Sequence, residues 1–284
     1  MEESIVAAAA LPHRRWTGIR SEAREAFFFT YNNAASCAFA VWIFLWLGLT
    51  RWIAVPGIAR YDLMLLLCLA FQAFVVRRRI ETVDELKVIC VFHLLGLSME
   101  IVKVHYGSWS YPGPGVAKVL GVPLFSGFMY ASVASFMCQA WRRFDLVMVR
   151  WPRPAVAVPI AAAIYGNFFT NLFVPDLRWA ILPALFLAFG RTWVEYTPCR
   201  VRRRMPILVT FGLIAFFIWL AENIGTFLSA WRYPSQHHGW RPVYLQKLSS
   251  WYLLVIVSLL IVVELKRTKL RRMGQLVPGR IGHA

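Results

Sequence analysis

The sequence has little acidic charge and few cysteines. Its 284 residues include 14 Asp or Glu against 31 Lys or Arg, and charged residues make up 16% of the chain. There are five cysteines, an odd number, and most of them lie within apolar stretches, at Cys37, Cys68, Cys90 and Cys138. Such thiols behave as small buried hydrophobes, so we expect inert cysteines and no disulfide framework.

Several motifs that mark common chemistries are absent from the sequence. It contains no Gly-x-Gly-x-x-Gly, no phosphate-binding loop and no Gly-x-Ser-x-Gly, so nucleotide binding and serine hydrolysis lack a local signal. It also lacks His-x3-His and Cys-x2-Cys spacings, and we therefore predict no metal site and no cofactor. No basic region precedes the short Ala-rich run near Met1, so we predict no cleaved signal peptide.

Hydrophobic residues are abundant, at 59% of the chain, which is more than a soluble core of this size would bury. The formal net charge of +17 is spread in short clusters between apolar runs. This arrangement indicates contact with anionic membrane lipids and argues against nucleic acid as a partner. Protein partners are left open by the sequence.

Eight apolar segments approach the roughly 20 residues that a membrane-spanning helix needs. They are 34–50, 61–76, 86–104, 121–141, 154–174, 178–196, 206–228 and 250–265. Most Lys and Arg residues fall in alternate connections, and basic residues accumulate on the cytoplasmic side. The sequence therefore predicts an all-α polytopic bundle of about eight transmembrane helices with both termini in the cytoplasm.

One motif occurs twice. Glu100 begins the pattern Glu-x8-Trp-x-Tyr-Pro, and Glu222 begins the same pattern 122 positions later. Four predicted helices separate equivalent positions, so the two copies share one orientation and predict a parallel 4+4 duplication. We divide the chain into a cytoplasmic N-terminal segment, a first half, a second half and a basic cytoplasmic tail, at 1–30, 31–150, 151–268 and 269–284.

Glu100 and Glu222 are the candidate catalytic residues. Each lies about six residues inside its predicted helix end, or roughly 9 Å below the outer boundary. A carboxyl group at that depth indicates a functional site with a partner nearby, although a purely structural pair is the alternative. Lys103 makes Glu100 the candidate for a paired carboxylate, whereas the neutral Asn223 makes Glu222 the candidate for a protonated acid.

Further candidate substrate-binding residues surround the two carboxyl groups. His93 and Lys103 share a helix face with Glu100, and His105 lies at the mouth of this candidate site. The aromatic residues of the repeated loops either anchor the protein at the membrane interface or line a pocket beside each acid; these are Trp109, Tyr111, Trp231 and Tyr233. Tyr130 is an additional cavity group. Arg191 and Glu195, spaced i and i+4, are expected to neutralise one another on one helix.

Four stretches carry a resemblance to a known family. They are Gly107-Ser108-Trp109-Ser110-Tyr111-Pro112, Gly121 to Tyr130 (Gly-Val-Pro-Leu-Phe-Ser-Gly-Phe-Met-Tyr), Asn167-Phe168-Phe169-Thr170 and Trp219-Leu220-Ala221-Glu222-Asn223. The chain resembles, over most of its length after about residue 25, the bacterial family called domain of unknown function 817, or YoaT-like. The resemblance implies a multi-pass bacterial inner-membrane protein and brings no established activity.

A fainter similarity, limited to the repeats, points to the tandem membrane-embedded carotenoid (lycopene) cyclases. Those enzymes also show a Pro-x-Glu-Glu type motif after the Tyr, and Gly121-Val122-Pro123-Leu124 and Leu245-Gln246-Lys247-Leu248 have no paired acids here. The leading hypothesis is an enzyme or binding protein for a lipophilic, isoprenoid-like or lipid-like molecule held between the halves. A secondary transporter is the alternative, and a structural membrane component is a third class. Whether the protein is an enzyme stays open.

Overall fold

The computed structural model describes residues 18–171 and 173–272. The expected absence of a signal peptide concerns residues outside these ranges, as does most of the predicted tail at 269–284. Within the described residues the protein is mostly helical, in agreement with the expected class. The helices are α2 (Ile19–Ser36), α3 (Ala38–Trp52), α4 (Arg60–Arg77), α5 (Val83–His105), α6 (Ser126–Arg143), α7 (Pro154–Thr170), α8 (Arg178–Phe189), α9 (Ile207–Phe227), the short 3-10 helix η2 (Pro234–Gln236) and α10 (Lys247–Arg272).

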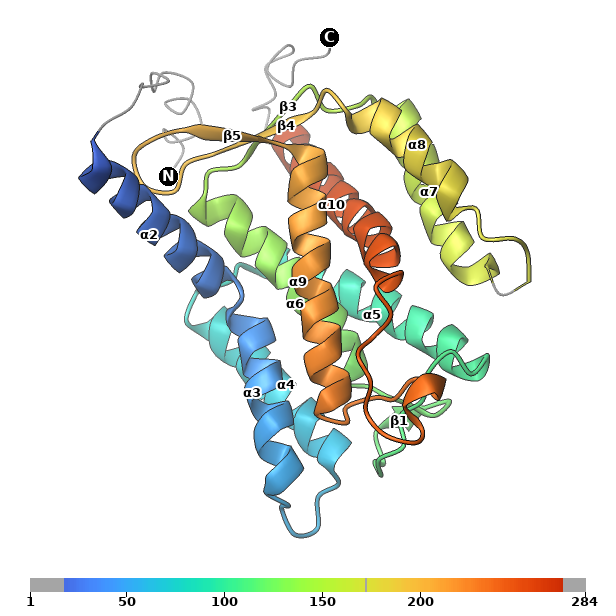
Figure 1. Cartoon of the computed structure of the whole chain (residues 1–284). Coiled ribbons are helices and arrows are strands. Elements are labelled where there is room, and N and C mark those ends of the chain that lie inside the picture. The colour runs from blue at the N-terminus through green and yellow to red at the C-terminus, as the bar shows by residue number, and fades with distance from the viewer. Residues whose placement is uncertain (1–17, 172, 273–284) are drawn as a thin grey trace.

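Short strands occupy the two ends of the bundle. The hairpin of β1 (Lys118–Val119) and β2 (Val122–Pro123) lies near η2 at one end, and an antiparallel sheet lies at the other (Figure 1). That sheet has the order β3-β4-β5, with β3 at Val147–Val149, β4 at Trp193–Tyr196 and β5 at Arg203–Pro206. We call the end with η2 the loop end and the other the sheet end.

Local sequence signals set the starts of the helices. The Thr82 hydroxyl accepts from the Glu85 backbone N–H at 3.2 Å, and the Glu85 carboxylate accepts from the Thr82 N–H at 2.8 Å. This capping box satisfies two N–H groups that the first turn of α5 leaves unpaired. α7 begins at Pro154, a position where the missing N–H of proline costs nothing.

Among the described residues, two helices, α5 and α9, are long and apolar enough to cross a bilayer by themselves. α2 and α3 pass the same test as a pair, but they are bent by 61° at a break that contains Cys37. α7, α8 and the Lys247–Val263 part of α10 are shorter apolar helices. A helix overlaps each of the eight predicted segments in the sequence. The number of membrane crossings stays a prediction.

The sixth predicted segment, 178–196, is wrong at its C-terminal end. α8 ends at Phe189, and the chain then enters β4, where Trp193 to Glu195 pair with both neighbouring strands and Tyr196 pairs with β5. The expected pairing of Arg191 with Glu195 is wrong for the same reason, because the two residues do not share a helix. Glu195 instead accepts from the Arg202 guanidinium at 2.9 Å.

Candidate functional site

The two candidate acids are buried at corresponding places on the two helices that pass the bilayer test. Glu100 on α5 is 3% exposed and Glu222 on α9 is 4% exposed. Each precedes the end of its helix by about one and a half turns. Burial of a carboxyl group requires hydrogen-bond donors or a counterion, so the surroundings of each acid define the site.

Aromatic side chains supply every hydrogen bond that the Glu100 carboxylate receives from the described residues. Its Oε2 accepts from the Trp109 indole N–H at 2.6 Å and from the Tyr111 hydroxyl at 2.8 Å. Its Oε1 accepts from the Tyr130 hydroxyl at 2.8 Å. Burial first, and then the nearby Glu100 carboxylate, hold the pKa of Tyr111 well above its usual range, so this phenol stays protonated as a donor.

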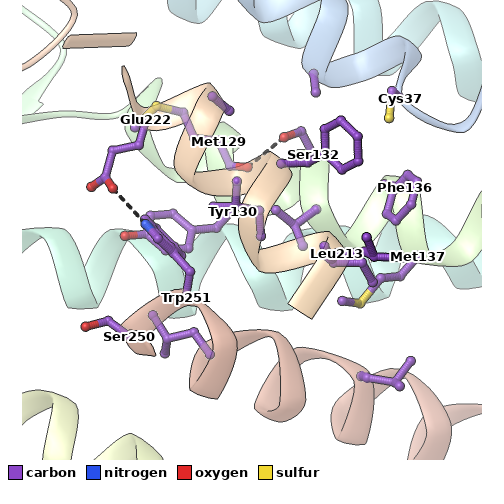
Figure 2. A pocket seen from close by; sticks show the side chains of 18 of the residues that line it. Cys37, Met129, Tyr130, Ser132, Phe136, Met137, Leu213, Glu222, Ser250 and Trp251 are labelled. Carbon is purple, nitrogen blue, oxygen red and sulfur yellow. Dashed lines mark hydrogen bonds between the residues drawn. The ribbon is translucent and has the colours of Figure 1, made fainter. Parts of the chain in front are cut away.

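Glu222 has a similar but smaller set of donors. Its Oε1 accepts from the Tyr233 hydroxyl. Its Oε2 accepts from the Trp251 indole N–H at 2.8 Å (Figure 2). Burial, followed by the Glu222 carboxylate, raises the pKa of Tyr233 well above its ordinary value. Both carboxyl groups are therefore enclosed by aromatic rings that present N–H or O–H groups inward.

The repeated loops pair with each other at equivalent positions. Ser110 and Arg232, 122 residues apart, exchange two backbone hydrogen bonds of 2.9 Å each, in antiparallel register. Next to this bridge the Trp109 and Tyr233 rings meet edge to face, with centroids 5.9 Å apart. The pairing relates the two loops by a local two-fold axis and brings both carboxyl groups to one end of the molecule.

The two copies differ in how their first aromatic residue is used. Trp109 donates to Glu100, whereas the Trp231 ring packs directly on Gly225, where a methyl group would collide with it. The residue that corresponds to Gly225 in the first copy is Lys103, so only the second copy has room for the indole there. Trp251, on α10, then supplies the indole N–H to Glu222.

A cavity of about 1080 Å³ lies next to both carboxyl groups. Side chains of α2, α3, α6, α9 and α10 form most of its wall, and apolar residues dominate, including Ile43, Met129, Phe136, Met137, Leu213 and Leu254. Figure 2 shows Tyr130 and Trp251 near Glu222, with Phe136 and Cys37 farther along the wall. On α9 the lining runs from Ile207 to Glu222, which corresponds to ~22 Å at 1.5 Å per residue.

A family model and a bacterial relative match most of the chain. A family model described as "Protein of unknown function (DUF817)" matches residues 25–259. The chain belongs to this family. It is 53% identical over 241 residues to the "Uncharacterized protein YoaT" of Bacillus subtilis (strain 168), an alignment that covers 85% of this chain and 91% of the relative. No solved structure matches.

The expected resemblance to the DUF817 family is thus confirmed, whereas the fainter similarity to carotenoid cyclases stays a prediction. The family description names no activity, so the functional argument for this DUF817 protein rests on its own site. The name of the Bacillus subtilis relative specifies no ligand or reaction either.

Most of the predicted site residues come together around the cavity of this DUF817 protein. Its lining includes both acids and several of the predicted partners, namely Lys103, Trp109, Tyr130, Trp231 and Tyr233. Tyr111 lies behind this lining as a donor to Glu100. We expected the Lys103 ammonium to pair with the Glu100 carboxylate, and it does not. It donates instead to the Asn171 amide oxygen at 2.8 Å and lies 4.6 Å from the centre of the Phe168 ring.

Three predicted residues lie apart from the cavity. The His93 ring packs on Phe128, with centroids 4.5 Å apart, because α6 approaches α5 closely at Gly127. His105 is exposed and packs on Tyr106. Asn223 tethers a loop, since its amide oxygen accepts from the Val243 N–H at 2.9 Å.

Sequence reasoning did not find Trp251, Lys247 or Arg178, which also line the cavity. The Lys247 ammonium lies 5.0 Å from the centre of the Trp109 ring and 4.8 Å from that of Tyr233. A signal for Trp251 was present in the repeat, because its neighbour Tyr252 lies 122 positions after Tyr130. Within the described residues, no group of three or more His, Cys, Asp or Glu side chains is placed to hold a metal ion.

Proposed function

We propose that this protein is a multi-pass membrane protein that binds an elongated lipophilic molecule, isoprenoid-like or lipid-like, in the cavity next to Glu100 and Glu222. The observation that carries the proposal is the cavity itself. Its volume of about 1080 Å³ is just above the usual range for ligand sites, and its wall is predominantly apolar, with the charged residues gathered at the end where the acids lie. A long apolar molecule with one polar end matches that distribution.

The membrane part of the proposal is supported by the outer surface. Large apolar side chains are exposed on several helices, among them Leu94 at 66%, Leu187 at 86% and Phe217 at 66%. Soluble proteins rarely expose so many, because water disfavours contiguous apolar surface. We propose eight spans at the predicted segments, in the bacterial inner membrane, with both termini in the cytoplasm and the loop end on the outside.

The duplication is part of the same proposal. Glu100 to Tyr111 and Glu222 to Tyr233 place their acids and tyrosines alike, and their loops pair around a local two-fold axis. Each acid-bearing helix packs mainly on the helix that follows its loop, α5 on α6 and α9 on α10. These relations are the ones that two parallel four-helix halves would have.

The test is mass spectrometry of the lipids that copurify with the full chain in mild detergent. We expect a defined lipid with the wild type, and a loss of most of it in Ala221→Phe, since Ala221 lines the cavity beside Glu222. Ala163→Phe is the matched control, because Ala163 is exposed on α7 and does not line the cavity. Equal lipid content in both variants, or no bound lipid in the wild type, would contradict the proposal.

Glu100→Gln and Glu222→Gln extend the test to function. Total lipid extracts of cells that express each variant are compared with those of wild-type cells. A lipid change that appears with the wild type and disappears in either variant assigns the acids to the activity. Variants that behave like the wild type would leave the acids with a structural role and remove them from the proposed site.

A secondary transporter is the second candidate, and the length of the cavity favours it. The lining extends from the acids at the loop end to Val194 and Met205 in the sheet at the other end. A passage with that extent resembles the path of a carrier, although both acids lie at one end and carrier sites usually lie near the midplane. Uptake into proteoliposomes that responds to a proton or ion gradient would select this candidate.

A further inference from the structure

Three cationic side chains line the polar end of the cavity. Lys103 comes from α5, Arg178 from the start of α8 and Lys247 from the start of α10. The Arg178 guanidinium pairs with the Asp176 carboxylate through its Nε, at 2.5 Å. Its Nη1 donates to the Ser249 hydroxyl at 3.0 Å and to the Gln246 carbonyl at 3.4 Å, near Lys247, and its Nη2 keeps its donors unused within the described residues. The three cations and the two acids therefore share one end of the cavity.

At this end of the cavity the acids already have hydrogen-bond partners, whereas the lysines have N–H donors to spare. The carboxyl groups of Glu100 and Glu222 already receive aromatic donors on both oxygens. An ammonium group has three N–H donors, and that of Lys103 makes a single hydrogen bond within the described residues, to Asn171. The end of the cavity is thus rich in unused donors.

Lys247 has the largest unused capacity. Among the described residues its ammonium has ring faces as neighbours, those of Trp109 and Tyr233, and lies within 4.0 Å of no carboxylate oxygen. It is also the first residue of α10, whose first turn contains no acidic side chain. The N-terminus of a helix carries a partial positive charge, which adds to that of the lysine.

We propose that the polar group of the bound molecule is a phosphate or diphosphate, held by Lys103, Lys247 and Arg178, with the apolar chain along the cavity. This inference rests on the proposed lipid-binding function and adds the chemical class of the head group. A phosphate presents several acceptor oxygens and up to two negative charges, which suits three cations with unused donors. A hydroxyl head group accepts at most two hydrogen bonds and carries no charge, and an ammonium head group accepts none.

The test measures binding to the purified full chain in a neutral detergent, with three probes. These are geranylgeranyl diphosphate, its uncharged alcohol geranylgeraniol, and inorganic diphosphate. We expect the lipid diphosphate to bind at least about tenfold more tightly than the alcohol, because the diphosphate accepts charge-assisted hydrogen bonds that the alcohol cannot form. Inorganic diphosphate, which lacks the apolar chain, is expected to bind more weakly than the lipid diphosphate.

Variants of the lysines identify the head-group site. Lys103→Met and Lys247→Met are expected to weaken binding of the lipid diphosphate by about tenfold or more, while geranylgeraniol binds as before. Lys247→Arg, which keeps the charge, should retain most of the affinity and guards against a folding defect. Lys87→Met is the control on the same helix, since the Lys87 side chain is 73% exposed.

The possible outcomes distinguish a failure of the head-group assignment from a failure of the lipid-binding function on which it rests. Equal binding of geranylgeraniol and the diphosphate, unchanged by the lysine variants, would overturn the head-group assignment and leave the lipid cavity standing. Binding of inorganic diphosphate as tight as that of the lipid diphosphate would assign a free anion site instead. If none of the probes binds, the lipid-binding function itself fails.

Discussion

The two acids beside the cavity, Glu100 and Glu222, are held by residues that serve two purposes. Trp and Tyr side chains have a polar tip and an apolar body, so one residue can donate to a carboxylate and still pack in an apolar wall. Tyr130 and Trp251 do both, because each donates to an acid and lines the cavity. Lysine or arginine in these places would neutralise the acids but would make the wall of the cavity polar.

At the residue scale, Gly225 lies where the Trp231 ring leaves no room for a larger side chain. An added methyl group would overlap the Trp231 ring, so we expect Gly225→Ala to lower the free energy of unfolding by about 1–3 kcal/mol, as overpacking usually does. Thermal unfolding in detergent measures the effect. Gly166→Ala is the matched helical control, since it meets no atom within 4 Å, and it should be neutral or slightly stabilising.

At the element scale, α2 is fixed to the sheet end by its acidic and amide side chains. Glu25 of α2 is 2% exposed and accepts from the backbone N–H groups of Cys199 and Arg200, at 3.2 and 3.0 Å. Asn32, two turns later, donates to the Pro198 carbonyl at 2.9 Å. This docking places α2, and with it the bend at Cys37, along the cavity wall.

Glu25→Ala should therefore destabilise the protein clearly more than Glu22→Ala. Loss of Glu25 leaves two backbone N–H groups without their partner, at about 1–3 kcal/mol for each that stays buried. Glu22 pairs with Arg203, but both side chains are more than a third exposed, and such pairs contribute about 0–1 kcal/mol. Unfolding temperatures of the two variants compare the contacts directly, and equal losses would refute the proposed docking role of Glu25.

At the scale of the whole molecule, the hydrophobic pattern predicted where the helices lie, and local patterns predicted part of the site. Trp109 and Tyr111 could be placed beside Glu100 because they follow it on the same chain segment. Contacts between distant segments were not predictable. The β4 strand was assigned to a helix because it follows the apolar α8 closely in the sequence, and its pairing with β3 and β5 comes from outside the segment.

The repeat also shows where extrapolation by symmetry fails. Tyr252 corresponds to Tyr130 and would be expected to donate to Glu222, but its hydroxyl donates to the Leu208 carbonyl at 3.1 Å. The preceding residue, Trp251, makes the bond to Glu222 instead. A shift of one residue on a helix rotates the side chain by about 100°, and a duplicated sequence does not reveal such a shift.

The proposed eight spans make a prediction about the two ends of the molecule. Val116, which is 93% exposed, and Ser235 lie in the connections that follow α5 and α9, whereas Lys87 lies at the other end of α5. In a variant without native cysteines, we expect Val116→Cys and Ser235→Cys to react with a membrane-impermeant maleimide in intact spheroplasts. Lys87→Cys should react after permeabilisation alone, because basic residues mark its side as cytoplasmic. Labelling of all three from one side would mean that α5 does not cross the bilayer, and the apolar cavity beside it would then need a different explanation from a membrane-embedded lipid site.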